Sequence, residues 1–132
     1  MRKVLFSLIV TALPVAGSAF GLFNHPQILT AKPISTTNFE VIERPGAGPR
    51  AYWCAAARHV EITLGHRHGR IYIAVGRGPS VTSPGRKAVQ FTTVLFGDVA
   101  PSYSVSITQA GYNLSSGHAL HFCDDYITTD IF

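Results

Sequence analysis

The sequence predicts an α+β domain in which one helix packs on a mainly antiparallel sheet of about five strands, with one disulfide. Three observations predict this fold. Residues 49–64 carry apolar side chains at helical spacing, several shorter segments alternate apolar and polar residues as strands do, and only two cysteines are present. One strand before the helix and four after it is the order of a two-layer α+β domain.

The N-terminal residues 1–19 are expected to be a secretory signal peptide. Arg2 and Lys3 precede an apolar run over residues 4–16, and small residues follow it, which is the order that signal peptidase requires. This run is shorter than the roughly 20 apolar residues of a membrane-spanning helix. We therefore expect a periplasmic or secreted protein that begins at Phe20 and has no membrane span after cleavage.

Residues 20–35 mix apolar side chains with asparagine and proline at no helical or strand period. This irregularity predicts an extended N-terminal arm rather than a core element. The domain itself is expected to span residues 36–126, and residues 127–132 are expected to form a C-terminal tail. A chain of this length after signal cleavage has enough residues for one domain with one core.

The first strand is expected around Phe39 and Val41. Both alternate with polar neighbours such as Glu40, which predicts one buried and one solvated face. The prolines and glycines of residues 45–49 then end the strand, since neither residue type continues it readily.

The helix is expected to begin at Pro49, because N–H groups of the first helical turn have no intrahelical partner and the missing N–H of proline therefore costs nothing there. Four apolar residues follow on one face, at spacings of four, three and four: Trp53, Ala57, Val60 and Leu64. Gly65 is the expected C-terminal cap. Trp53 shares the apolar face, so we expect it in the core rather than in an aromatic binding patch.

Four strands are expected after the helix. Alternation predicts them at residues 71–75, 89–93, 102–108 and 120–123, with a glycine- and proline-rich loop over residues 76–85. The third of these has the most regular period of two. Antiparallel pairing of the last two strands is the simplest topology.

Cys54 and Cys123 are the only cysteines, so they are expected to form one disulfide if the chain is exported to an oxidising compartment. Neither belongs to a C-x-x-C pair, which disfavours a reactive thiol. The bridge is therefore expected to be structural.

The charge of the chain disfavours a nucleic-acid partner. The sequence has 11 Lys and Arg against 7 Asp and Glu, a net charge of +4, and loses two of the basic residues with the signal peptide. The others are spread along the chain, whereas a nucleic-acid binder usually shows a dense basic face. We expect no nucleic acid as partner.

Four segments share features with a known group: Arg44–Gly48, Tyr52–Ala56, Gly76–Ser80 and Ala88–Thr92. Together they resemble a set of small exported proteins from alpha-proteobacteria that carry no assigned role, over roughly residues 38–123. The resemblance implies that the disulfide and the strand-helix-strand order are traits of that group. It carries over no catalytic residue.

The loop after the second strand is the candidate anion-binding site. Arg77, Ser80, Arg86 and Lys87 are the residues expected to hold a phosphate, sulfate or carboxylate. No acidic residue lies within residues 70–87, so this local charge is expected to be unopposed. An ordinary long hairpin connection explains the glycines and prolines as well, and the lysine of a P-loop is absent.

Histidines provide a weaker alternative. His66 and His68 form H-x-H, and His118 and His121 form H-x-x-H, but neither spacing is a recognised metal motif. No serine lies in a G-x-S-x-G elbow. We expect no cofactor and no metal, with His66 and His68 as the ligands if one binds.

The sequence therefore favours a non-enzymatic exported domain of the cell envelope or medium that binds a protein or a small anionic partner. A small histidine-dependent metal-binding protein or hydrolase is the alternative. The first hypothesis is preferred because no segment matches a catalytic signature.

Overall fold

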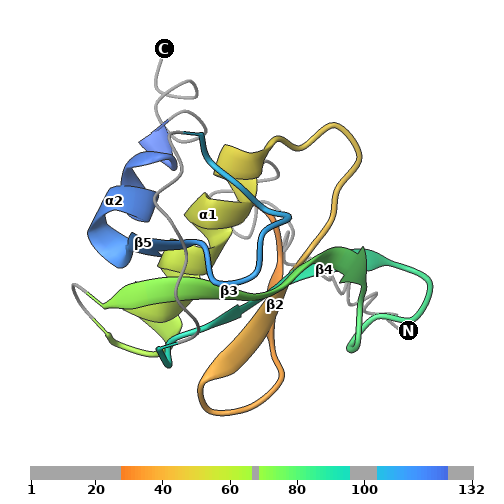
Figure 1. Ribbon diagram of the computed structural model, residues 1–132, viewed down its shortest axis with the longest axis horizontal. Coiled ribbons are helices and arrows are strands. Elements are labelled where there is room, and N and C mark those ends of the chain that lie inside the picture. Colours follow the sequence, from red (N-terminus) through yellow and green to blue (C-terminus); the bar gives the residue numbers. More distant parts are fainter. Residues whose placement is uncertain (1–27, 67–68, 96–103, 125–132) are drawn as a thin grey trace, which may run out of the picture.

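The computed structural model describes residues 28–66, 69–95 and 104–124. They form a five-stranded sheet with helices against it (Figure 1). In chain order the elements are β1 (Ala31–Pro33), β2 (Asn38–Ile42), α1 (Pro49–Arg58), the π-helical turn η2 (His59–Thr63), β3 (Arg70–Pro79), β4 (Lys87–Thr92), β5 (Asn113–Ser115) and α2 (Ser116–His121). The expected signal peptide and C-terminal tail lie outside the described residues.

The sheet has the order β1-β2-β4-β3-β5, and every neighbouring pair is antiparallel. Phe39 pairs with Phe91 across β2 and β4, so their rings lie on the same face. The predicted α+β class with an antiparallel five-stranded sheet is thus confirmed. No helix within the described ranges is long and apolar enough to cross a membrane.

Helix α1 supplies most of the second layer. It begins at Pro49 after the N-cap residue Gly48, and its residues Ala51–Ala57 are all buried. The helical path continues through η2 and ends before Gly65, whose φ of 72° is the left-handed conformation expected of a helix C-cap. The sequence predicted this helix and its cap correctly.

Trp53 lies in the hydrophobic core. It is fully buried, and its ring meets Phe91 edge-on with the centroids 5.0 Å apart. Its indole N–H donates to the backbone oxygen of Ser106 at 2.8 Å, which satisfies the one polar atom of the ring. The prediction that Trp53 is a core residue is confirmed.

The predicted disulfide is present. Cys54 and Cys123 are bridged across 69 positions, with their Cα atoms 4.9 Å apart. The bridge joins α1 to the residues just after α2, and the two helices pack against each other (Figure 1). Both cysteines are buried in the core.

The prediction of an extended arm is wrong for residues 28–35. Leu29 is buried in the core, and β1 pairs with β2 in the register Ala31 to Val41. A strand of three residues shows no measurable period, so the sequence pattern missed it. Pro33 fits there because β1 is an edge strand, where a missing N–H breaks no ladder.

The strand predicted over residues 102–108 is also wrong where the structure describes it. Residues 104–108 form bends instead. The Ser106 hydroxyl accepts hydrogen bonds from the N–H groups of Thr108 and Gln109, and such local bonds compete with a ladder. The segment nevertheless lies against β3, because a Cβ on Gly76 would collide with the backbone of Thr108.

The closing strand predicted at residues 120–123 is replaced by helix α2, and β5 occupies the sheet edge instead. Ser115 caps α2, since its hydroxyl accepts a hydrogen bond from the His118 N–H at 3.1 Å. Two alternating apolar residues were too short a pattern to separate a strand from a helix of six residues. The expected pairing of the last two predicted strands therefore does not occur.

Candidate functional site

The end of the β3–β4 hairpin folds back onto β2, and a buried carboxylate holds it there. Glu40 is fully buried, although the sequence placed it on a solvated face. Its oxygens accept hydrogen bonds from the Ser80 hydroxyl at 2.5 Å, from the Val81 and Thr82 N–H groups at 3.1 and 2.9 Å, and from the Thr82 hydroxyl. Glu40 therefore fixes the conformation of residues 80–82.

The ionisation of Glu40 follows from these contacts. Burial raises the pKa of the Glu40 carboxyl group, but the hydrogen bonds from Ser80, Thr82 and Val81 favour the charged form. Their combined effect outweighs burial, so the pKa lies below its ordinary value of 4.5. Glu40 is a carboxylate at neutral pH, and the Ser80 hydroxyl donates its hydrogen bond to this carboxylate.

Glu43, one residue past the end of β2, neutralises the first of the predicted loop cations. The Arg77 Nε donates to the Glu43 carboxylate at 2.6 Å, and a second guanidinium nitrogen contacts the same oxygen. Burial raises the pKa of the neighbouring Tyr52, with a further rise from Glu43 and opposing effects of Arg77. Arg77 is thus tied to both an acidic and an aromatic partner.

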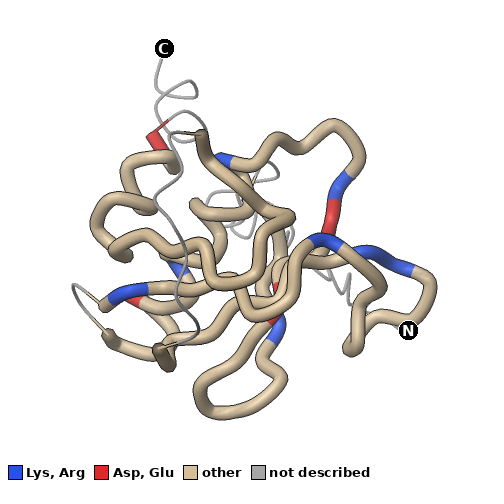
Figure 2. Tube along the Cα trace, viewed as in Figure 1, with Lys and Arg blue, Asp and Glu red and all other residues tan. Residues whose placement is uncertain are grey.

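The expectation of an unopposed loop charge is therefore wrong. It counted acidic residues along the chain, whereas the opposing carboxylates Glu40 and Glu43 come from β2 and its C-terminal end. Basic positions of the turn after β2 and of the hairpin still gather at one end of the molecule (Figure 2). Of the predicted site residues, Arg77 binds Glu43 and Ser80 binds Glu40. Lys87 is exposed on β4.

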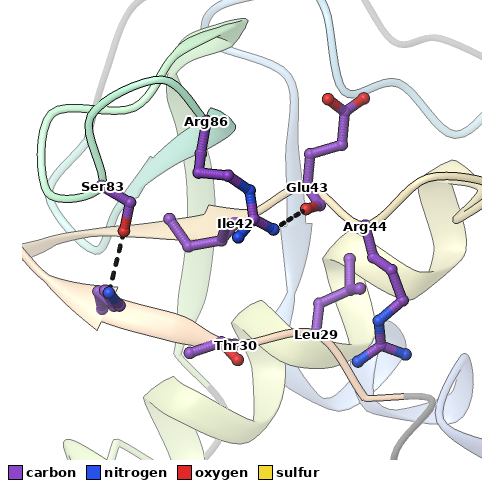
Figure 3. A pocket seen from close by; sticks show the side chains of 8 residues that line it. Leu29, Thr30, Ile42, Glu43, Arg44, Ser83 and Arg86 are labelled. Atoms are coloured by element: carbon purple, nitrogen blue, oxygen red, sulfur yellow. Dashed lines mark hydrogen bonds between the residues drawn. The ribbon is translucent and has the colours of Figure 1, made fainter.

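Arg86 belongs to a cavity that we call the basic pocket. It has a volume of about 250 Å³ and is lined by Leu29, Thr30, Lys32, Ile42, Glu43, Arg44, Ser83 and Arg86 (Figure 3). Lys32 comes from β1, Arg44 from the turn after β2, and Arg86 from the hairpin. The three segments meet because β1 and β4 both pair with β2.

The cations of the basic pocket are held by neutral oxygens. Lys32 Nζ donates to the Ser83 hydroxyl at 2.9 Å, Arg44 to the Ile28 carbonyl at 3.3 Å, and Arg86 to the Glu43 carbonyl at 2.7 Å. The one carboxylate among the residues drawn, that of Glu43, points away from these bonds and binds Arg77 (Figure 3). These three bonds position the cations, and none of the three is to a carboxylate.

The basic pocket includes two residues that the sequence did not single out as site residues. Lys32 lies in the segment expected to be an extended arm, and Arg44 follows the first expected strand. The signal that could have found Lys32 is the sequence Ala31-Lys32-Pro33, since a charge next to proline is typical of an edge strand. Lys87 does not line the pocket.

The histidine alternative receives no geometric support within the described ranges. His66 is exposed after η2, and His68 lies outside those ranges. No group of three or more His, Cys, Asp and Glu side chains in the described part of the chain could hold a metal ion. His118 and His121 lie on α2, where His121 approaches Asp124 at 3.9 Å.

Comparisons with known proteins identify no relative for this chain. No model of a protein family, no curated protein and no solved structure matches it.

Proposed function

We propose that the protein is an exported, non-enzymatic binding domain of the cell envelope or medium, whose basic pocket holds an acidic group of a protein or small anionic partner. The observation that carries the proposal is the convergence of Lys32, Arg44 and Arg86 on one cavity, while the nearby Glu43 carboxylate binds Arg77 instead.

The geometry suits a carboxylate or phosphate group. The cations are already oriented by hydrogen bonds to neutral oxygens, so less side-chain entropy is lost when a ligand binds. Guanidinium groups pair with both kinds of anion through two parallel hydrogen bonds. At about 250 Å³ the cavity is smaller than the roughly 300–1,000 Å³ of typical ligand pockets, which favours a single acidic group over a whole cofactor.

The contact of Lys32 Nζ with the Ser83 hydroxyl at 2.9 Å suggests an alternative function for the pocket, that of a serine–lysine hydrolase. A lysine that serves as a general base must be neutral, and burial or a second cation normally achieves this. Lys32 is exposed on an edge strand. An exposed lysine that contacts a single neutral hydroxyl is suited to binding an anion rather than to activating Ser83.

The binding test uses two probes, inorganic phosphate and the peptide acetyl-Glu-Glu, titrated at low and moderate salt and followed by NMR. The double variant Lys32→Ala/Arg86→Ala is expected to lose about tenfold or more in affinity, since a hydrogen bond to a charged group contributes roughly 1.5–3 kcal/mol. Wild-type affinity is expected to fall as salt rises. The probe that binds more tightly distinguishes a phosphate from a carboxylate partner.

The matched control is Arg70→Ala/Lys87→Ala, which removes the same two charges from exposed positions that do not line the pocket. Its affinity is expected to stay near that of the wild type. An equal loss in both double variants would show that net charge alone attracts the probes. If the wild type binds neither probe at low salt, the proposal is wrong.

Export has its own test. Mass spectrometry of protein recovered from the envelope or the medium is expected to show a chain that begins at Phe20 and is two hydrogens lighter than the reduced sequence. The small residues before Phe20 and the Cys54–Cys123 bridge motivate this expectation. A chain that retains Met1, or that has two titratable thiols, would contradict it.

A further inference from the structure

A second cavity lies beside η2. It has a volume of about 220 Å³ and is lined by Ile28, Leu29, Ala31, Ala55, Arg58, His59, Ile62 and Thr63. Leu29 lines this cavity and the basic pocket, so the segment before β1 separates the two. We call this second cavity the η2 pocket.

His59 is the unusual residue of the η2 pocket. His59 is only 7% exposed, and its ring packs against Phe39 at a tilt of 36°, with ring centroids 4.3 Å apart. Burial lowers the pKa of His59, so its ring is neutral at pH 7 and presents one N–H donor and one acceptor nitrogen. Within the described ranges, neither nitrogen has a hydrogen bond, although buried polar groups normally do.

The backbone next to His59 also departs from regular structure. Residues His59–Thr63 form a π-helical turn, in which the Leu64 N–H reaches the His59 carbonyl at 3.0 Å. Such turns are rare and occur frequently at functional sites. The unsatisfied ring and the π-turn are separate observations, and both concern the wall of the same cavity.

The remaining lining residues define the chemistry of a ligand. Five of the eight lining residues are aliphatic, and one of them, Ile62, is 68% exposed. Arg58 adds a cation that has no ion pair within the described ranges. The lining thus combines a short apolar surface, a neutral imidazole and a guanidinium group.

We propose that the η2 pocket binds a small monocarboxylate with a short apolar body. The carboxylate pairs with Arg58, the imidazole of His59 donates a hydrogen bond to it, and the aliphatic walls cover the apolar body. This inference does not depend on the basic pocket. It also gives the unsatisfied ring of His59 a hydrogen-bond partner.

The test titrates the full-length mature protein with 4-methylpentanoate and with its neutral amide. In the wild type, the acid is expected to give a saturable shift of the His59 ring signals in NMR spectra, and the amide is expected to bind at least several-fold more weakly. Arg58→Gln is expected to weaken the binding of the acid without weakening the binding of the amide. The absence of a saturable shift at His59 would overturn the proposal.

The variant His59→Phe separates a ligand-binding histidine from a structural one. It removes the unsatisfied nitrogens and keeps a ring against Phe39, so the melting temperature without ligand is expected to rise by several degrees. Its affinity for 4-methylpentanoate is expected to fall tenfold or more. His66→Phe, the same change at an exposed ring, serves as control and is expected to leave the affinity unchanged.

Two results with these variants would contradict the proposal. A marked fall in the melting temperature of His59→Phe would show that the ring nitrogens are satisfied in the folded protein. Unchanged affinity in His59→Phe would show that the ligand binds elsewhere. Because the basic-pocket variant Lys32→Ala/Arg86→Ala keeps His59 and Arg58, it should still bind 4-methylpentanoate, which keeps the two proposals distinguishable.

Discussion

Replacing both cysteines by alanine is expected to lower the free energy of unfolding by roughly 4 kcal/mol, because the bridge closes a long loop in the unfolded chain. Cys54 and Cys123 are separated by 69 positions and are 1% and 2% exposed. For a domain of this size, each kcal/mol corresponds to about 4–8 °C in melting temperature. The double variant Cys54→Ala/Cys123→Ala should therefore melt at least ten degrees or so below the wild type.

The loss of stability in the double cysteine variant is expected to be uneven across the molecule. Helix α2 has six residues and is held by the Ser115 cap, by packing on α1 and by the bridge. The sheet and α1 share large buried side chains such as Trp53 and Phe91, so we expect their core to persist without the bridge. Amide hydrogen exchange is therefore expected to accelerate most over α2, while β2 and β4 remain protected at low temperature.

Reduced wild-type protein provides the control. It should melt close to the double variant, and a reductant should leave the melting temperature of the double variant unchanged. An equal melting temperature for the oxidised wild type and the double variant would contradict the expected stabilisation by the disulfide.

The elements predicted correctly are those whose determinants are local. Strands β2 and β4 alternate over several residues, and α1 has a proline at its start, an apolar face and a capping glycine. The disulfide followed from having only two cysteines. The strands and the helix are determined by residues within one short window, and two cysteines allow only one pairing.

The elements predicted wrongly depend on distant contacts. Alternating serines suggested a strand over residues 102–108, but the carbonyls of Ser106 and Ile107 accept hydrogen bonds from the Trp53 indole and the Arg77 N–H. These partners come from α1 and β3, far away in the sequence. Strand β1 is similar, since three residues become a strand only by pairing with β2.

The candidate sites were partly predictable for the same reason. The sequence singled out Arg86, which lines the basic pocket, but the location of this pocket depends on β1 and β4 both pairing with β2. The η2 pocket was not predicted at all. His59 lies in a helical window that gives no sign of a π-turn or of an unsatisfied ring, because both are properties of packing.

The buried carboxylate of Glu40 offers the other large effect. Glu40→Ala is expected to lower the free energy of unfolding by about 3 kcal/mol or more, because it removes a charged acceptor and leaves several donors of residues 80–82 without a partner. The loop should loosen, and Ser83 and Arg86 of the basic pocket should become less ordered. Urea unfolding and hydrogen exchange of residues 80–83 measure the two effects.

The pH dependence isolates the charge of Glu40, and Glu40→Gln is the matched variant because it keeps the shape of the side chain. The pKa of Glu40 is lower in the folded protein than its ordinary value of 4.5, so the carboxylate stabilises the fold above that pH. This stabilisation is lost as the pH falls through the folded-state pKa. The other carboxylates are common to both proteins and cancel in the comparison.

The difference in unfolding free energy between wild type and Glu40→Gln is therefore expected to be largest at neutral pH and to shrink steadily as the pH falls below 4.5. Urea titrations of both proteins between neutral pH and the acid limit of the folded state measure it. A difference that stays constant over this range would show that hydrogen bonds from Ser80 and Thr82 do not hold Glu40 in its charged form. In that case the hairpin end would be fixed by side-chain shape, and the variant would leave the basic pocket intact.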